Sequence, residues 1–379
     1  MGWFNFSKKG VVGIDIGTAS IKVVELIRDK GRFTLRNYGV FELHSGAGAV
    51  NVTSPKERAQ TSHLSNKDIV WTLKEVLKKT GIKSKDVVVS IPSSNTFTTV
   101  VSMPYLSEED LARSIQYEAR KYIPVPLEEV QIDWSVINAK GVKKEAVPKT
   151  PEPASEAPAS EELVPEKTPM VEVLLAAVPR EDIARYKTIM AEAGLKLKGL
   201  EIESFALTRG LIGNDLSPMC IVSIGGRSTS IFVVDNGFQR ISHDYGVGGY
   251  EVTRIIAKSL GISLDRAEEL QKSFGIRKSE DNVIRQAMVS LLDMMVFETK
   301  KTITHYEDLK KKKIGKIFLV GGLVNMPEFV TYFNEKLGRT AELGNPLGRI
   351  ITPAGLDKIK SELNTTFAVA IGLAMKEIK

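Results

Sequence analysis

The sequence predicts an α/β protein of two related halves, because one arrangement of strands occurs twice and the chain is too long for a single core. The stretch VVGIDIGTASIKVVEL (residues 11–26) is an apolar strand, a Gly-containing turn and a second apolar strand, and CIVSIGGRSTSIFVVDNG (residues 220–237) repeats that layout. Each hairpin continues through a tight turn into a third strand. Two similar three-strand units about half a chain apart indicate internal duplication. The length of 379 residues also exceeds one typical core.

The turn of the first hairpin has the composition of a phosphate-binding turn. Residues 17–20 (GTAS) are small, so a ligand can approach the backbone, and successive N–H groups and two hydroxyls can face an anion. Asp15 precedes the turn and can hold a divalent cation through water, while Lys22 adds a positive charge beside the phosphates. One such turn is more often only structural. Since the second hairpin repeats it, we predict that the two turns hold a phosphate tail from both sides.

Helical and strand patterns fill the rest of the first half. The expected elements are, in order, a helix capped by Asn66 and ended by Gly81, strands at 87–92 and 96–103, a helix opened by Ser107 that runs to Tyr122, and a strand at 129–137. From Gly141 to Pro169 the composition shifts, with six of the chain's 16 prolines among Glu, Lys, Ala and Ser, which predicts disorder. Strand character resumes at Val171, so we expect this segment to be a long loop inside a small domain.

The second half alternates helices and strands around the repeated hairpin. A strand-to-helix passage carries Glu201 and Glu203. The other expected elements are a helix at 180–194 before the repeated hairpin and, after Gly248 and Gly249, helices at 251–260, 264–274 and 282–313 and a strand-turn-helix unit at 316–338. In that unit, Gly321 and Gly322 allow a flat ring to lie against the backbone, and the following helix N-terminus favours a polar ligand edge. A Gly-Gly turn of this kind is, by itself, also a common structural turn.

Composition and missing motifs exclude several classes of protein. A single cysteine fits a reducing compartment, and no apolar run approaches the roughly 20 residues of a membrane span, so we expect a cytoplasmic protein. The net charge of +6 comes from scattered lysines without a nucleic-acid motif, so we expect no nucleic-acid partner. No P-loop, dinucleotide-binding fingerprint or metal-binding histidine spacing occurs in the sequence.

Two phosphate-type hairpins, a Glu-bearing helix start between them and a later strand with a Gly-Gly turn, in this order, resemble the actin-like ATPase superfamily of actin, sugar kinases and heat-shock chaperones. Within it, four stretches look like the PilM family of type IV pilus assembly proteins: GIDIGTASIKVVEL, EARKYIPVPLEEVQIDW, GLEIESFALTRG and FAVAIGLAMK. The resemblance covers nearly the whole chain apart from Gly141–Pro169.

The resemblance implies an actin-like two-lobed ATPase fold with ATP and Mg²⁺ in its cleft and an inserted subdomain like that of the division protein FtsA. The implied parts are a first lobe at 1–86 and 179–218, the inserted subdomain at 87–178, a second lobe at 219–350, and a C-terminal helix at 351–379 that returns to the first lobe.

The resemblance also assigns site residues. Glu203 takes the place where relatives position the attacking water, Glu268 matches an acid that touches ribose or adenine, and Asp15 faces the metal. The other implied binding residues are Gly17, Thr18 and Lys22 in the first phosphate loop, Gly225, Gly226, Ser228 and Thr229 in the second, and Gly321, Gly322 and Asn325 at the adenosine.

Two positions depart from the pattern of the ATP-hydrolysing relatives. Ser223 stands where their second phosphate loop usually begins with Asp, and Gln271 stands where they often have Lys. Because phosphoryl transfer depends on positioning and electrostatics, such losses can leave binding intact and make hydrolysis slow. We therefore expect at most a slow ATPase.

The sequence thus predicts a cytoplasmic, ATP-binding scaffold of type IV pilus assembly or of a related secretion machine. The resemblance implies that it docks the cytoplasmic tail of the inner-membrane protein PilN, with other inner-membrane assembly proteins as partners, and reaches the membrane only through them. The helix Glu108–Tyr122 and the segment Tyr122–Pro126 are candidate walls for that tail. Two alternatives remain open: a filament former like FtsA, which would end in a membrane-binding amphipathic helix, and a small-molecule kinase, whose catalytic acid we do not find in the sequence.

Overall fold

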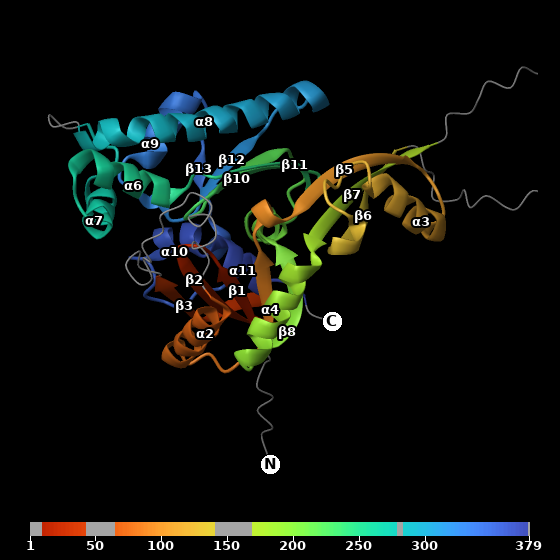
Figure 1. Cartoon of the computed structure of the whole chain (residues 1–379), viewed down its shortest axis with the longest axis horizontal. Helices are drawn as coiled ribbons and strands as arrows, with labels where there is room; N and C mark the ends of the chain where they lie inside the picture. The colour runs from red at the N-terminus through yellow and green to blue at the C-terminus, as the bar shows by residue number, and fades with distance from the viewer. Residues whose placement is uncertain (1–9, 43–64, 141–168, 279–282, 378–379) are drawn as a thin grey trace, which may run out of the picture. The chain divides into compact units, whose positions relative to one another are not determined.

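The computed structural model describes residues 10–42, 65–140, 169–278 and 283–377 (Figure 1). All but the last residue of the segment predicted to be disordered, Gly141–Pro169, lies outside the described residues. The chain divides into two compact units. One contains residues 1–96 and 179–379, and the other is Phe97–Val178.

The larger unit contains two five-stranded sheets with the same topology. The first has the order β3-β2-β1-β4-β8, and the second the order β11-β10-β9-β12-β13. In each, a three-stranded antiparallel meander is followed by two parallel strands. The strands are β1 (Gly10–Ile16), β2 (Ser20–Asp29), β3 (Arg32–Glu42), β4 (Asp86–Ile91), β8 (Lys196–Ile202), β9 (Met219–Ile224), β10 (Thr229–Asp235), β11 (Phe238–Tyr245), β12 (Lys316–Val320) and β13 (Glu342–Leu343). The predicted α/β class and the duplication are confirmed.

The tight turns that lead into the third strand of each meander are also equivalent. Lys30 and Gly31 have φ of 49° and 80°, and Asn236 and Gly237 have φ of 56° and 77°. Two successive residues with positive φ form the hairpin turn whose twist matches that of the flanking strands. The Asp-Lys-Gly and Asp-Asn-Gly sequences therefore set the register of both meanders.

Two short helices pack against both sheets. They are α5 (Glu203–Leu207) and α11 (Ala368–Ala374). Along β9, Ile221 belongs to the cluster that contains Leu207 and Ala368, whereas Val222 faces the opposite cluster. On the side of the first sheet, α11 contacts β1, β2 and β4. α5 and α11 are therefore shared by the two halves of the duplication.

The contact of α11 with the first sheet has no side chain between the two backbones. A Cβ on Gly13 of β1 would lie 2.0 Å from the carbonyl oxygen of Ala370, and a Cβ on Gly372 would lie 2.0 Å from that of Ala206 in α5. Real Cβ atoms do not approach that closely, so both positions require glycine.

The outer faces of the sheets are covered by separate helices (Figure 1). The first sheet carries α2 (Asn66–Thr80), which contacts β3, and α4 (Arg180–Glu192), which contacts β8. The outer cluster of the second sheet contains residues of the helices α6 (Gly249–Leu260), α7 (Leu264–Phe274), α8 (Val283–Lys310) and α9 (Phe329–Leu337). α10 (Lys360–Thr366) precedes α11. None of the helices in the described ranges is long and apolar enough to cross a membrane.

The smaller unit is a three-stranded sheet with one helix. Its strands are β5 (Phe97–Pro104), β6 (Val130–Lys140) and β7 (Met170–Pro179), in the order β5-β7-β6, and its helix is α3 (Glu108–Ala119). Leu111 and Ile115 of α3 pack on the sheet in a shared apolar core. Since β6 and β7 are neighbours, the segment between them joins adjacent strands of one sheet, as the pattern predicted.

Three boundaries differ from the sequence-based expectation. The smaller unit begins at Phe97, not at 87, because β4 pairs with β1 and β8 of the first sheet. The cap of α2 is Ser65, whose hydroxyl accepts the N–H of Asp68 at 3.2 Å. Helix α3 ends at Ala119 rather than at Tyr122, because the chain then enters a turn before Pro124.

Candidate functional site

Asp15 lies at the carboxyl end of β1 and is almost fully buried. The hydroxyl of Ser90, at the end of the parallel strand β4, donates to Asp15 Oδ1 at 3.0 Å. Lys22 Nζ, directly across the antiparallel pair, donates to Asp15 Oδ2 at 3.4 Å. Ligands of open α/β sheets bind at the carboxyl ends of parallel strands. The structure therefore places two predicted site residues, with one unpredicted serine, at the expected edge of the sheet.

Glu203 lies at the same edge, because it follows β8, which is parallel to β4. Burial, followed by the negative charges of Asp15 and Asp244, raises the pKa of Glu203 to about 8. A hydrogen bond from the Ser93 backbone N–H acts in the opposite direction. At neutral pH this carboxyl group is therefore mostly protonated and lies within electrostatic range of Asp15. The structure thus brings Asp15, Lys22 and Glu203 together.

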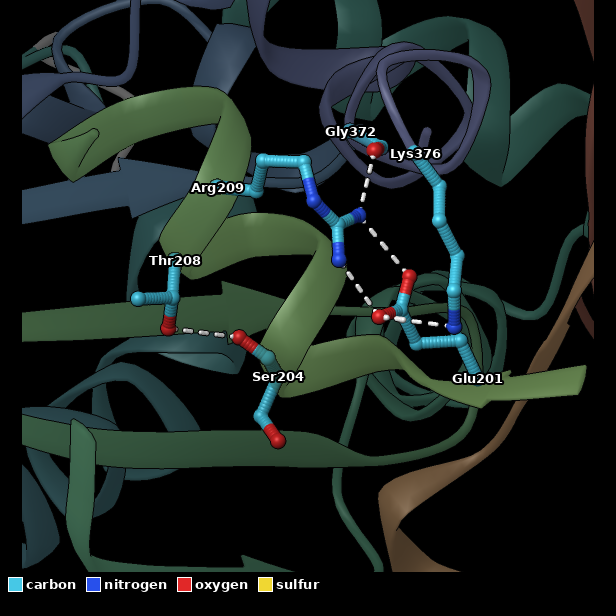
Figure 2. A network of polar contacts seen from close by, with 6 residues as sticks. All are labelled: Glu201, Ser204, Thr208, Arg209, Gly372 and Lys376. Carbon is cyan, nitrogen blue, oxygen red and sulfur yellow. Dashed lines mark hydrogen bonds and ion pairs between the residues drawn. The ribbon is translucent and has the colours of Figure 1, made fainter. Parts of the chain in front are cut away.

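An ion-pair network fixes the strand-to-helix junction that carries Glu203 (Figure 2). Arg209 donates to both oxygens of Glu201, at 2.8 and 2.5 Å, and to the carbonyl oxygen of Gly372 in α11 at 2.7 Å. Lys376 Nζ adds a contact to Glu201 at 3.3 Å. A two-pronged guanidinium-carboxylate pair is both strong and geometrically specific. Two residues before Glu203, β8 is therefore tied to the helix that both sheets share.

The second hairpin repeats the backbone of the first. The Gly225 N–H donates to the Ser228 carbonyl at 2.9 Å, as the Gly17 N–H does to that of Ser20 at 3.0 Å. A Cβ on Gly226 would lie 2.8 Å from the Cβ of Ala19 and 2.9 Å from Thr18 Oγ1. The turns of the two hairpins are therefore in direct contact, so both can face the same ligand at their common exposed edge.

The second turn is supported from behind by the start of α6. The N–H groups of Gly249 and Tyr250 donate to the carbonyls of Gly225 and Gly226, at 3.0 and 2.7 Å. The guanidinium of Arg227 lies 4.3 Å from the centre of the Tyr250 ring, a cation-π contact.

Thr229 differs from its predicted role in this turn. It is fully buried, and its hydroxyl donates to the Val247 carbonyl at 2.7 Å. It therefore holds the turn in place instead of facing a ligand. Gly225, Gly226 and Ser228 remain in the turn itself, and all three are partly or fully exposed.

The predicted adenosine residues follow β12. Gly321 has φ of 107°, and a Cβ there would meet the Ile224 carbonyl at 2.0 Å. Gly322 is exposed, and a Cβ on it would meet no atom within 4 Å, which leaves open space where a ring could lie. Asn325 is bound to α10, since Thr365 Oγ1 donates to its side-chain oxygen at 2.9 Å.

Glu268 stands apart from the other predicted adenosine residues. It forms an ion pair with Lys272 on the surface of α7 at 2.8 Å. No hydrogen bond or ion pair within the described ranges joins it to Gly321, Gly322 or Asn325. Gln271, one of the two departures, is buried and accepts a hydrogen bond from Thr253 at 2.6 Å, so it is part of the packing between α6 and α7.

The acids fit magnesium only in one binding mode. Within the described ranges, no three His, Cys, Asp or Glu side chains are grouped to hold a metal ion. Mg²⁺ usually keeps several waters and uses one or two carboxylates together with substrate phosphates. A single buried carboxylate beside a turn of small residues, as Asp15 is, suits that mode.

Two polar residues near Glu203 were not predicted. Arg209 was missed because its role depends on the helical turn after Glu203, which brings its side chain to Glu201. Asp244 is the next-to-last residue of β11, and its importance depends on the register of β11 against β10. In the sequence, the signal for Asp244 was its position as a carboxylate near the end of the third strand of the repeat.

Two equivalent sheets, hairpin turns in contact and two helices shared between the sheets define an actin-like ATPase fold. The family model described as type IV pilus assembly protein PilM matches residues 13–149 and 161–378. The chain therefore belongs to the PilM family.

Solved structures of related fold are similar over nearly the whole chain. A structure titled PilM-PilN type IV pilus biogenesis complex is 20% identical with a TM-score of 0.75, and the match covers 98% of this chain and 99% of that one. MreB5 of Spiroplasma citri bound to AMPPNP is 13% identical with a TM-score of 0.51, covering 97% and 95%.

A similar protein by sequence is the cell division protein FtsA of Neisseria meningitidis serogroup B. It is 26% identical over 211 residues. The match spans 48% of this chain and 48% of FtsA, so the chain spans about half the length of this relative.

Proposed function

We propose that this chain is an ATP-binding scaffold of type IV pilus assembly. It docks the cytoplasmic N-terminal tail of a PilN-type inner-membrane protein, has other inner-membrane assembly proteins as partners, and lies on the cytoplasmic side, at the membrane through those partners. Membership of the PilM family supports the pilus role. The observation that carries nucleotide binding is the direct contact between the two hairpin turns, with Asp15 buried behind the first.

In this proposal the backbone N–H groups of both turns bind the phosphates, and the open side of Gly322 takes the adenosine. Mg²⁺, when bound, neutralises phosphate charge, and Asp15 holds it through water. Lys22 now neutralises Asp15 and is free to turn to the phosphates once a cation takes over that task. Arg209 keeps Glu203 in place through Glu201.

Hydrolysis is expected to be slow. Ser223 offers no carboxylate at the start of the second turn, and Glu203 carries a proton at neutral pH, so it is a poor acceptor for the proton of an attacking water. An ATPase of this kind remains in its ATP-bound form for long periods. That behaviour suits a scaffold or a switch better than a metabolic enzyme.

The test of nucleotide binding is calorimetry with ATP in the presence and absence of Mg²⁺. We expect Asp15→Ala to lose metal-dependent affinity and Gly322→Val to block the adenosine end. The control is Gly315→Val, because Gly315 is exposed just before β12, at the opposite end of that strand from Gly321, and a Cβ on it would lie 3.6 Å from the Pro218 carbonyl oxygen, an ordinary contact. Equal ATP affinity in the unchanged chain and both variants would sink the assignment.

The partner tail is proposed to bind on the smaller unit, along α3 and the segment after it. Leu111, Ile115 and Ile123 are buried in the core of that unit, so they are not available to a peptide. Tyr117 and Tyr122 are exposed, and the guanidinium of Arg120 lies 5.9 Å from the Tyr117 ring. Tyr117 lies on α3 and Tyr122 in the turn after it, and exposed aromatic side chains of this kind are typical contact residues for a peptide.

Two tyrosines with the same exposure give a matched test of this surface. Tyr122 and Tyr105 are each 41% exposed in the smaller unit, but only Tyr122 lies on the proposed wall. We expect Tyr122→Ala to weaken binding of a PilN-type tail peptide at nearly unchanged melting temperature, and Tyr105→Ala to leave it unchanged. If Tyr122→Ala binds the peptide with unchanged affinity, the tail does not bind along the segment that contains Tyr122.

The match to FtsA favours one second candidate, a nucleotide-dependent filament former. Electron microscopy and sedimentation of the ATP-bound chain at rising protein concentration test it. Filaments that appear with ATP and disappear without it would favour this candidate. A sedimentation coefficient that does not change with protein concentration would exclude it and favour the scaffold.

A further inference from the structure

Three polar residues form a row across the second sheet. Strand pairing places Ser223 of β9 opposite Ser230 of β10, and Ser230 opposite Asp244 of β11. Residues directly opposite each other in a sheet point to the same face. The carboxylate is therefore two strands from position 223, about 10 Å away at the usual strand spacing, and on the same face.

Asp244 is held by two hydroxyls of its neighbours. Ser230 donates a short hydrogen bond to Asp244 Oδ1, and Ser242 donates to Oδ2 at 3.0 Å. Among the described residues, no ion pair neutralises Asp244. Hydrogen bonds orient a carboxylate and stabilise its charge without cancelling it. Asp244 is therefore a fixed negative charge at the end of β11.

The surroundings place Asp244 at the site rather than behind it. β11 contacts the 3-10 turn Ser93–Asn95, and the backbone N–H of Ser93 binds the carboxyl group of Glu203. The negative charge of Asp244 also acts on Glu203. The hydroxyl of Ser93 is buried and makes no hydrogen bond within the described ranges. A buried hydroxyl without a partner, next to Glu203, is what a bound water or ligand would satisfy.

We propose that Asp244 supplies the negative charge that Ser223 lacks, and that it acts on the hydrated Mg²⁺ and terminal phosphate of bound ATP from β11. This rests on the proposed nucleotide binding. Ser230 and Ser242 serve as positioning residues for Asp244. In this chain, the negative charge that ATP-hydrolysing relatives usually carry at the start of the second turn is therefore supplied from β11.

The test measures ATP affinity by calorimetry, with Mg²⁺ and with chelator, in the full chain. The variants are Asp244→Asn, Asp244→Glu, Ser223→Asp with Asp244→Asn, and the control Asp308→Asn on the exposed end of α8. In Asp244→Asn the amide oxygen accepts from one serine and the amide NH2 donates to the hydroxyl oxygen of the other, so both side-chain contacts, and with them the fold, are retained. Losing a carboxylate that acts on a hydrated metal costs about 10- to 100-fold in metal-dependent affinity.

We expect Asp244→Asn to change ATP affinity in opposite directions with Mg²⁺ and with chelator. Asp244→Asn weakens ATP binding with Mg²⁺ about tenfold or more, and strengthens it with chelator, because a charge that repels bare phosphates is gone. Asp244→Glu and the Ser223→Asp, Asp244→Asn pair recover most of the magnesium effect, and Asp308→Asn changes neither value. A purely structural role would weaken binding in both conditions.

Two results would overturn the inference, and they differ from each other. If Asp244→Asn binds ATP with the full magnesium effect, Asp244 has no role in the site, although nucleotide binding stands. If the unchanged chain binds no ATP in either condition, the proposed function fails and the inference fails with it.

Discussion

The two hairpins have the same backbone and different charges. Positions 15 and 223 are equivalent in the two sheets, as are positions 22 and 230, and both turns are closed by the same glycine N–H bond. In the first hairpin these positions hold a buried Asp-Lys pair, and in the second they hold two serines. Duplication therefore kept the backbone of the turn that we propose binds phosphate, whereas the charges of the two hairpins diverged.

The two turns are also stabilised by different means. The first is backed by the ion pair of Asp15 and Lys22 and by Ser90 on the neighbouring strand. The second is backed by backbone bonds to the start of α6 and by the hydroxyl of Thr229. In the proposed ATP complex, a cation that accompanies ATP would therefore meet a buried carboxylate on the first hairpin and none at the equivalent position of the second.

The largest expected difference comes from exchanging the equivalent residues 15 and 223. Asp15→Asn keeps an acceptor for Ser90 but removes the charge, and we expect it to lower Mg-ATP affinity about 10- to 100-fold. Ser223→Ala removes only a hydroxyl and should change that affinity little. Calorimetry on both variants checks this. Similar losses at the two positions would mean that the hairpins share the metal equally.

The next effect is on pH dependence, through Glu203. Because its pKa is raised from 4.5 to about 8, any hydrolysis that needs its carboxylate rises about tenfold per pH unit below that pKa. Single-turnover ATP hydrolysis between pH 6 and 9 measures this slope. Glu203→Gln should give a slow rate that does not vary in this way.

The same raised pKa affects stability, with a definite sign. Between pH 4.5 and about 8 the folded chain holds a proton on Glu203 that the unfolded chain has lost, so this group's contribution to stability falls as pH rises through that window. Glu203→Gln lacks this contribution. Its melting temperature relative to the unchanged chain should therefore increase with pH, and a constant difference would contradict the assignment.

The smallest expected effect is a gain. If the missing carboxylate at 223 limits hydrolysis, Ser223→Asp should raise the ATPase rate a few-fold at nearly unchanged ATP affinity, since it makes the second hairpin more like the first. Steady-state phosphate release gives the rate. No increase would show that the charge difference between the hairpins does not limit turnover.

Local signals in the sequence predicted much of this fold. The Asp-Asn-Gly turn at 235–237, the helix at 264–274 and the Gly-Gly turn at 321–322 could all be placed because each depends on residues a few positions apart. The hairpin motif singled out Asp15 and the family resemblance singled out Glu203, whose roles in the site stay predictions.

The missed features depend on long-range pairing. β4 joins the first sheet only through β1 and β8, and Arg209 is recognised only through Glu201 and Gly372. The row that ends at Asp244 exists only once β9, β10 and β11 are in register. Sequence periodicity gives the face of a strand but not its neighbour, so such residues remained hidden.

The contact between Gly13 and Ala370 sets the order in which this chain can finish folding. From Ile16 at the end of β1 to Ala368 at the start of α11 the ribosome must add 352 residues, which takes roughly 20–70 s at 5–20 residues per second. During that time Val24, Leu26 and Leu35, which α11 later covers, remain open on the nascent first sheet. A chain that stops before Ala368 would expose this apolar face permanently, and would be a substrate for chaperones and proteases rather than a partner in assembly.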